Sequence, residues 1–121
     1  MTTIEFSREC PRLEVDTTDL QGLKYSIQVT ELFFSFGDKM LGGIGRVAMT
    51  SPPEIWIALT KKFRPLDLRE LRRAITEASK RVGYLRARVV LGDKKAAKFA
   101  FACGLMWEED VGGFHFFSVR G

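Results

Sequence analysis

The stretch that decides the fold runs from residue 54 to residue 91 and reads EIWIAL (54–59), TKKFRPLD (60–67), LRELRRAITEASKRVG (68–83) and YLRARVVL (84–91). The first piece is short and nearly all apolar, as is typical of a central strand covered on both faces. In the third piece Leu71, Ile75 and Ala78 recur at three- and four-residue spacing, which predicts an amphipathic helix ending near Gly83. The last piece predicts another strand. This order predicts two parallel strands joined by a right-handed crossover.

The start of this helix has its own pattern. Asp67 is a residue type that caps helix N-termini well, and Glu70 follows three residues later, as in a capping box. We therefore expect Asp67 to be the N-cap residue of the helix.

The residues that follow, 93–105 (DKKAAKFAFACGL), predict a second helix. Asp93 is its expected cap, and Gly104 is its expected stop because glycine readily adopts the left-handed conformation found after helices. Residues 105–109 and 114–119 then predict a closing hairpin across Gly112 and Gly113.

The residues before position 54 predict a further hairpin. Residues 26–36 are rich in β-branched and aromatic types, and a turn at Gly37 separates them from the apolar residues 40–49. Glycines within the second of these strands indicate a bulge or a close approach of the backbone. The glycines are Gly42, Gly43 and Gly45. Residues 1–25 have no firm assignment beyond a short strand at residues 13–15.

Together these elements predict an α/β (α+β) fold in which a mixed β-sheet is flanked by helices. The 121 residues contain no internal repeat and no linker, so we expect a single domain over residues 1–121. An apolar content of 45% with ten phenylalanines is ordinary for a globular chain.

The composition excludes several classes of protein. No run of residues approaches the roughly 20 apolar residues of a membrane span, and the first ten carry Glu5, Arg8 and Glu9 where a signal peptide would be apolar. Two cysteines without CxxC spacing and one histidine do not supply the four ligands of a structural zinc site. We expect a cytoplasmic protein that contains no metal.

The basic residues are unevenly distributed, since thirteen of the 19 Lys and Arg but only four of the 15 Asp and Glu lie in residues 61–98. Such a basic half is found on nucleic-acid surfaces and at sites for phosphate-rich cofactors. The solvated face of a helix gives the same count, and most of these residues fall at outward helix positions.

The order of elements resembles the GNAT acetyltransferase fold, over roughly residues 28–119. The most telling piece is residues 93–105, which is similar to the family's Ala-rich helix with a closing glycine. The resemblance implies that acetyl-CoA lies between two splayed parallel strands, with its pyrophosphate at the N-terminus of the helix between them. The corresponding loop here is KKFRPLD (61–67).

This loop departs from the family's glycine-rich phosphate loop. Pro65 has no backbone N–H, no glycine allows the backbone to close around a phosphate, and Asp67 brings a negative charge. The basic side chains of Lys61, Lys62 and Arg64 can compensate in part, which makes them the candidate cofactor-binding residues.

The catalytic residues of the family are also incomplete. The tyrosine that protonates the leaving thiolate is replaced by Ala100. Glu54 is the one candidate base, and a carboxylate at the start of a strand is more often simply solvated. His115 in the last strand is read as a half-exposed strand residue, and Trp56 and Trp107 as core residues.

Arg86 and Arg88 lie on one face of their strand. They can bind an anion in the cleft, or they can belong to a solvated or ion-paired face. The sequence leaves both interpretations open.

Three functions follow, in order of expectation. The first is a non-catalytic assembly protein that acts through contacts with other protein subunits, because the chain also resembles small tail-associated virion proteins of tailed phages. The second is an acetyl-CoA-dependent N-acetyltransferase, and in that case alone is a cofactor expected. The third, resting on the basic half alone, is a nucleic-acid-binding module. The expected partner surface consists of Phe114, Phe116 and Phe117, because the two faces of an end hairpin cannot both be buried in a small domain.

Overall fold

The computed structural model describes residues 4–10 and 28–121. The short strand expected at residues 13–15 lies outside the described residues. The chain divides into two compact units. The first holds the described residues up to Ser51 together with Ile55–Asp67, and the second holds Pro52–Glu54 and Leu68–Gly121.

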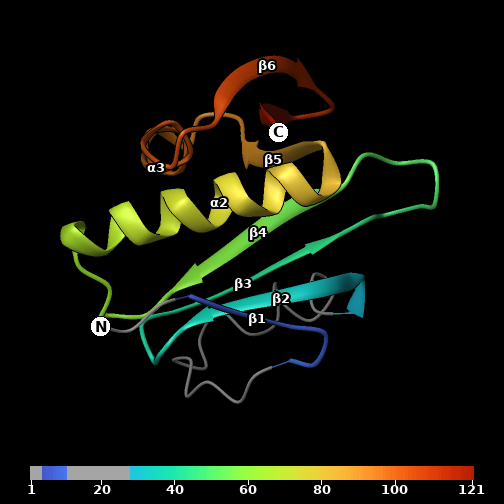
Figure 1. Cartoon of the computed structure of the whole chain (residues 1–121). Helices are drawn as coiled ribbons and strands as arrows, with labels where there is room; N and C mark the ends of the chain where they lie inside the picture. Colours follow the sequence, from blue (N-terminus) through green and yellow to red (C-terminus); the bar gives the residue numbers. More distant parts are fainter. Residues whose placement is uncertain (1–3, 11–27) are drawn as a thin grey trace. The chain divides into compact units, whose positions relative to one another are not determined.

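The first unit contains an antiparallel sheet of β1 (Glu5–Ser7), β2 (Thr30–Phe36) and β3 (Met40–Gly45), which lie side by side in Figure 1. β2 and β3 form the expected hairpin, although both strands are shorter than predicted. Gly37 in the turn has a φ of 53°, a conformation that glycine adopts at no steric cost. The buried residues of these strands are Phe33, Phe34, Phe36, Met40, Leu41 and Ile44.

Two glycines of β3 confirm the expected close approach. A Cβ atom at Gly42 would lie 2.2 Å from the ring of Phe34, and one at Gly43 would lie 2.5 Å from Nε1 of Trp56. Both distances are too short for a side chain, so the aromatic rings pack directly on the glycine backbone. These glycines therefore have a packing role.

The second unit combines two helices with three strands (Figure 1). The elements are α2 (Leu68–Val82), β5 (Tyr84–Val90), α3 (Lys94–Ala102), β6 (Met106–Val111) and β7 (Phe114–Arg120). β7 pairs antiparallel with β5 and with β6. α2 contacts β5 and β7, and α3 contacts all three strands.

The helices follow their sequence patterns. Leu71, Ile75 and Ala78 on α2 are buried, as the spacing predicts. In α3 the carboxylate of Asp93 accepts the backbone N–H of Ala96 at 3.1 Å, which confirms the predicted cap. Gly104 beyond α3 has a φ of 92°, as expected of a glycine after a helix.

β4 (Glu54–Leu59) and β5 form the predicted parallel pair, in which Glu54 is the register partner of Arg86. Among the described residues, hydrogen-bonded neighbours follow the order β1-β2-β3-β4-β5-β7-β6, a mixed sheet accompanied by α2 and α3, so the predicted α+β class is confirmed. β4 is less covered than its apolar sequence predicts, because only Ile55 is buried and Leu59 is exposed. The prediction of one domain stays a prediction.

Candidate functional site

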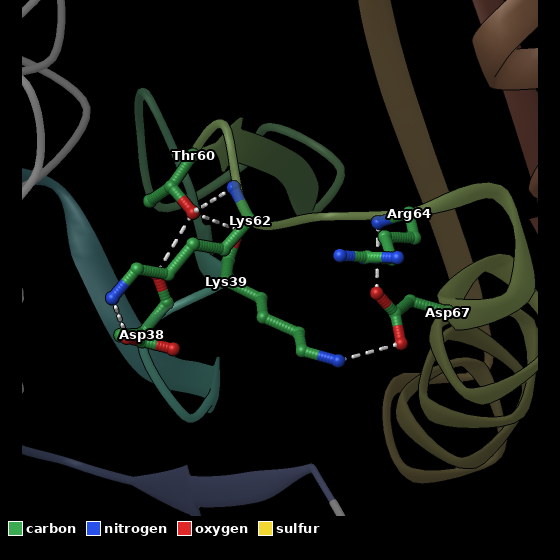
Figure 2. Close-up of polar contacts among 6 residues, drawn as sticks. All are labelled: Asp38, Lys39, Thr60, Lys62, Arg64 and Asp67. Atoms are coloured by element: carbon green, nitrogen blue, oxygen red, sulfur yellow. Dashed lines mark hydrogen bonds and ion pairs between the residues drawn. The ribbon is translucent and has the colours of Figure 1, made fainter.

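The loop that joins β4 to α2 belongs to the first unit and is held together by its own hydrogen bonds (Figure 2). The Thr60 hydroxyl accepts the backbone N–H of Lys62 at 3.3 Å and donates to the Lys39 carbonyl at 3.0 Å. The backbone N–H of Phe63 donates to the Thr60 carbonyl at 3.1 Å. Thr60 therefore fixes the start of the loop against the β2–β3 turn.

The helical segment begins one turn earlier than the sequence predicts. A 3₁₀ turn, η2 (Pro65–Asp67), precedes α2. The carboxylate of Asp67 reaches back to accept the backbone N–H of Arg64 at 2.8 Å, so Arg64 is the cap position and Asp67 is the third residue of the turn. The predicted cap at Asp67 is wrong because Pro65 suits the first helical position, where no N–H is needed.

Asp67 has a second partner in Lys39, whose Nζ lies 3.0 Å from its carboxylate (Figure 2). The Arg64 N–H, and after it Lys39, hold the pKa of Asp67 below its ordinary value. Glu70, which a capping box would direct to the helix start, instead pairs with Arg73 at 3.2 Å. The negative charge in this loop is thus balanced by a lysine from the β2–β3 turn.

These bonds decide how the loop can meet a phosphate. The backbone N–H groups of Lys62, Phe63, Arg64 and Asp67 all donate within the loop, and Pro65 has none. The backbone therefore does not fit the pyrophosphate of a CoA molecule as a cradle of free N–H groups would. The cationic side chains of this loop fit the pyrophosphate better, because its oxygens accept charge-assisted hydrogen bonds.

Three cationic side chains remain as candidates, and the structure brings them into one exposed loop. Lys61, Lys62 and Arg64 are all exposed. Lys62 makes an ion pair with Asp38 across the loop, and this contact holds the pKa of Asp38 below its ordinary value (Figure 2). The predicted cation trio is therefore accessible to an anion, with one member already paired.

Glu54 lies in the second unit and is not simply solvated. Its two carboxylate oxygens accept from Nε and Nη2 of Arg88 at 3.0 and 3.1 Å. Its side chain is 18% exposed, against 44% for Arg88. The geometry is a bidentate ion pair, which fixes the carboxylate in one orientation.

Proton donors for a leaving thiolate are scarce in the described part of the second unit. Ala100, at the place of the family's tyrosine, is buried. Burial raises the pKa of the Cys103 thiol to about 12, so Cys103 is inert at neutral pH. Tyr84 donates to Glu108, and burial followed by this contact raises its pKa, which keeps the phenol protonated.

The expected partner surface on the last hairpin is differently arranged. Phe116 and Phe117 are buried, and Phe114 is half-buried. The expectation of an exposed aromatic face is wrong because the guanidinium of Arg86 lies over the ring of Phe116 and both helices contact the strand. The role of these residues in partner binding stays a prediction.

Exposed apolar side chains lie instead on the edge strand β6. Trp107 is 58% exposed, so it is not the core residue predicted, whereas Trp56 is half-buried and donates to Thr30 at 2.7 Å. The indole of Trp107 donates to Asp110 at 2.8 Å, and His115 contacts the same carboxylate oxygen at 2.5 Å. His115 is half-buried, as expected.

Sequence analysis missed the two turn residues, Asp38 and Lys39, that balance charges in the candidate loop. No signal within the loop points to them, because they lie more than twenty positions earlier in the chain.

Within residues 4–10 and 28–121, no three His, Cys, Asp or Glu side chains group as metal ligands. Over the same residues, no helix has the length and apolarity to cross a membrane. The cytoplasmic location and the nucleic-acid alternative stay predictions.

No protein-family model matches the chain, and no curated protein matches it. Solved structures do match. An acetyltransferase of Bacillus subtilis in complex with CoA is 14% identical, with a TM-score of 0.61 and coverage of 99% of both chains. The N-acetyltransferase PseH of Campylobacter jejuni in complex with acetyl coenzyme A is 16% identical over 84% of this chain and 76% of its own, with a TM-score of 0.57.

A third similar structure is the ribosomal-protein-S5-alanine acetyltransferase of Vibrio fischeri, 13% identical over 84% of this chain and 67% of its own, with a TM-score of 0.57. The chain therefore has the GNAT fold, which confirms the predicted resemblance. The prediction of a non-catalytic phage assembly protein is wrong, since the similar structures are acetyltransferases and two of them are complexes with CoA or acetyl-CoA.

Proposed function

We propose that this chain is an acetyl-CoA-dependent N-acetyltransferase. In the reaction, the nitrogen of a primary amine forms a bond to the acetyl carbonyl carbon, and the bond between that carbon and the CoA sulfur breaks. The amine loses one proton and the thiol leaves. The observation that carries the proposal is the match of nearly the whole chain to an acetyltransferase that was solved with CoA.

The charges of the loop after β4 support the binding of a polyanion. CoA carries a pyrophosphate and a further phosphate, and phosphate oxygens accept charge-assisted hydrogen bonds from Lys and Arg. Lys61, Lys62 and Arg64 would hold these groups through their side chains, since the loop's N–H groups are largely used internally. Binding through exposed cations is weakened by salt, because the Debye length is only about 8 Å at physiological ionic strength.

Glu54 is the residue we assign to the amine. The bidentate pair with Arg88 fixes the orientation of the Glu54 carboxylate, and we place this carboxylate beside the acceptor's ammonium group as the base that takes its proton. Tyr84 in the same unit is protonated, but its hydroxyl already donates to Glu108 and its raised pKa makes it a weaker acid, so we assign it no role in proton transfer.

The test is calorimetric titration with acetyl-CoA and CoA, followed by measurement of free thiol released in the presence of a primary amine. The experiment uses Cys10→Ser protein, because Cys10 is exposed and would react with a thiol reagent. Saturable heat and amine-dependent thiol release are expected. Absence of both at millimolar acetyl-CoA and low salt would contradict the proposal.

A matched pair of variants tests the role of the loop. Changing Lys61, Lys62 and Arg64 together to Gln should abolish or strongly weaken the heat of acetyl-CoA binding. The control changes Lys94, Lys95 and Lys98 to Gln, which removes the same charge from exposed positions on or beside α3. If both triple variants weaken binding equally, net charge rather than the loop is responsible.

A further inference from the structure

Two arginines on the same face of β5 have different surroundings. Arg88 is fully engaged, since its Nε and Nη2 bind both oxygens of Glu54. Arg86, two residues before it, faces Ser118 across the β5–β7 ladder and has no such partner. The two arginines therefore differ in whether an acceptor satisfies the guanidinium group.

Arg86 holds an unsatisfied donor. Its Nε–H is buried and has no hydrogen-bond partner, and its side chain is only 16% exposed. The nearest carboxylate oxygen, Oε1 of Glu109, lies 3.6 Å from Nη2, which is too far for a hydrogen bond. A buried donor without an acceptor is costly, so the site is more favourable when an acceptor arrives.

The guanidinium is also held rigidly. Its central carbon lies 3.6 Å from the centroid of the Phe116 ring, and Phe116 itself is buried. The ring occupies one face of the planar group, so a ligand in the same plane would meet its edge, which carries Nε and Nη2. Nε is buried, so a ligand reaches it only when a covering side chain moves. A carboxylate matches this edge because its two oxygens accept two parallel hydrogen bonds.

We propose that Arg86 binds the carboxylate of the acceptor, so that the substrate is an amine that also carries a carboxylate. This inference rests on the proposed function. Glu54 is the register partner of Arg86 on the adjacent strand, which places the carboxylate assigned to the amine next to the arginine assigned to the acid. An amino acid, or a similar amino carboxylate, offers both charges at once.

The local charge balance favours a singly charged anion over a phosphate. Two arginines, Arg86 and Arg88, stand against two carboxylates, Glu54 and Glu109, so the cluster is neutral. Because the two guanidinium charges are already balanced, a dianion would give the cluster a net negative charge, whereas a zwitterion brings an ammonium group for Glu54 together with a carboxylate for Arg86. The loop at residues 61–67 has the opposite character, with three exposed cations.

Glu109 is the competitor for this site. It is the side chain that approaches Nη2 of Arg86, and it is 51% exposed. A half-exposed side chain at 3.6 Å is weakly held and can swing out when a substrate carboxylate arrives. The Glu109→Gln variant should therefore bind an amino carboxylate more tightly than the wild type.

The experiment compares 4-aminobutyrate with n-butylamine, two amines of similar length and basicity that differ in the carboxylate. With acetyl-CoA, the wild type should acetylate 4-aminobutyrate with a kcat/KM about tenfold higher or more, in line with one charge-assisted bidentate contact. Arg86→Lys keeps the charge but lacks Nε–H and should lose most of this preference. Arg120→Lys, the same change at an exposed position of β7, should retain it.

A second readout does not depend on acetyl transfer. The Nε–Hε resonance of Arg86, assigned by its loss in Arg86→Lys, should shift when 4-aminobutyrate is added to the protein alone and should not shift with n-butylamine. In the Glu109→Gln protein, the shift of this resonance should reach its maximum at a lower concentration of 4-aminobutyrate.

The outcomes separate the two proposals. If both amines are acetylated equally and the resonance does not move, the carboxylate site is wrong and the acetyltransferase function stands. If no amine is acetylated but the resonance shifts with 4-aminobutyrate alone, the acetyltransferase proposal fails and the carboxylate site stands. No acetylation and no shift would overturn both.

Discussion

The loop at residues 60–67 and the strand β5 are both rich in basic residues, but they use their hydrogen-bond donors in opposite ways. In the loop, four backbone N–H groups donate to other atoms of the loop, and the exposed side chains supply the charge. In β5, Arg86 keeps a buried donor that nothing in the described residues satisfies. The loop is therefore suited to weak, salt-dependent attraction of a large polyanion, and the strand to a directional contact with a small one.

The largest expected effect comes from Glu54→Gln, which would leave Arg88 without its bidentate partner and so remove its difference from Arg86. Loss of a general base lowers kcat by about 10²–10⁴-fold, so acetyl transfer should fall at least a hundredfold. Steady-state thiol release measures this.

The Glu54→Gln variant should also unfold at a slightly lower urea concentration. Its free energy of unfolding should fall by about 1 kcal/mol, because Glu54 is mostly buried while Arg88 is partly exposed. Full activity in Glu54→Gln would contradict its assignment to the amine.

The triple change of Lys61, Lys62 and Arg64 to Gln comes next. Each exposed cation contributes a screened contact, so the Kd for acetyl-CoA should rise about ten- to a hundredfold, equivalent to about 1.4–2.8 kcal/mol. Calorimetry at two salt concentrations measures the size of this rise in Kd and shows whether its cause is electrostatic. The wild-type Kd should rise with salt, and that of the variant should be nearly insensitive to it.

Asp67→Asn sharpens the view of the loop, because it removes a negative charge beside the three cations. Acetyl-CoA should bind about three- to fivefold more tightly, as expected for loss of one screened repulsion. The stability of the folded chain should fall in this variant, although its affinity for acetyl-CoA rises. Asp67 loses its charge-assisted bonds from the Arg64 N–H and Lys39, so the variant should have the lower Tm at pH 7.

The pH dependence of that stability difference has a defined sign. The pKa of Asp67 is lowered in the folded chain from its ordinary value of 3.8, so its contribution is present above that value and is lost as pH falls through the folded pKa. The Tm difference between wild type and Asp67→Asn should therefore shrink on acidification below about pH 4. A constant difference down to pH 2 would rule out this account.

Glu109→Gln has the smallest expected effect and sharpens the view of β5. Removing a half-exposed competitor should lower the Kd for 4-aminobutyrate about threefold, since exposed ion pairs contribute about 0–1 kcal/mol. The shift of the Arg86 Nε–Hε resonance measures it. A weaker Kd would mean that Glu109 takes part in binding the substrate.

The sequence predicts the elements of the fold well because their patterns are local. The spacing of Leu71, Ile75 and Ala78 predicts α2, and Asp93 and Gly104 predict both ends of α3. The start of the earlier helical segment was misplaced because Asp67 fits both the cap and the third position, and only the Arg64 N–H distinguishes them.

The candidate site is harder to predict, because it depends on contacts between distant residues. Lys39 pairs with Asp67 across 28 positions, and Arg88 pairs with Glu54 across 34. The sequence shows that Arg86 and Arg88 share a face, but which of them has an acceptor depends on packing against Phe116 and on the position of Glu109. For the same reason, composition alone did not predict that Phe116 is buried.

The strand β6 is last in the order of the sheet, and all six of its residues are exposed. An exposed edge strand offers open backbone groups to the strand of another molecule, and Met106, Trp107 and Val111 would add apolar contacts. Glu108, Glu109 and Asp110 place three carboxylates in the middle of that edge. Two copies that met along β6 would bring six like charges together, which opposes aggregation at neutral pH.

One of these three charges, that of Asp110, should persist to lower pH than is usual for an aspartate. Hydrogen bonds from Trp107 and then His115 hold the pKa of Asp110 below its ordinary value. Asp110 therefore keeps its negative charge at a pH where an ordinary aspartate begins to lose it. The hydrogen bonds from Trp107 and His115 thereby also maintain a negative charge on the exposed edge strand.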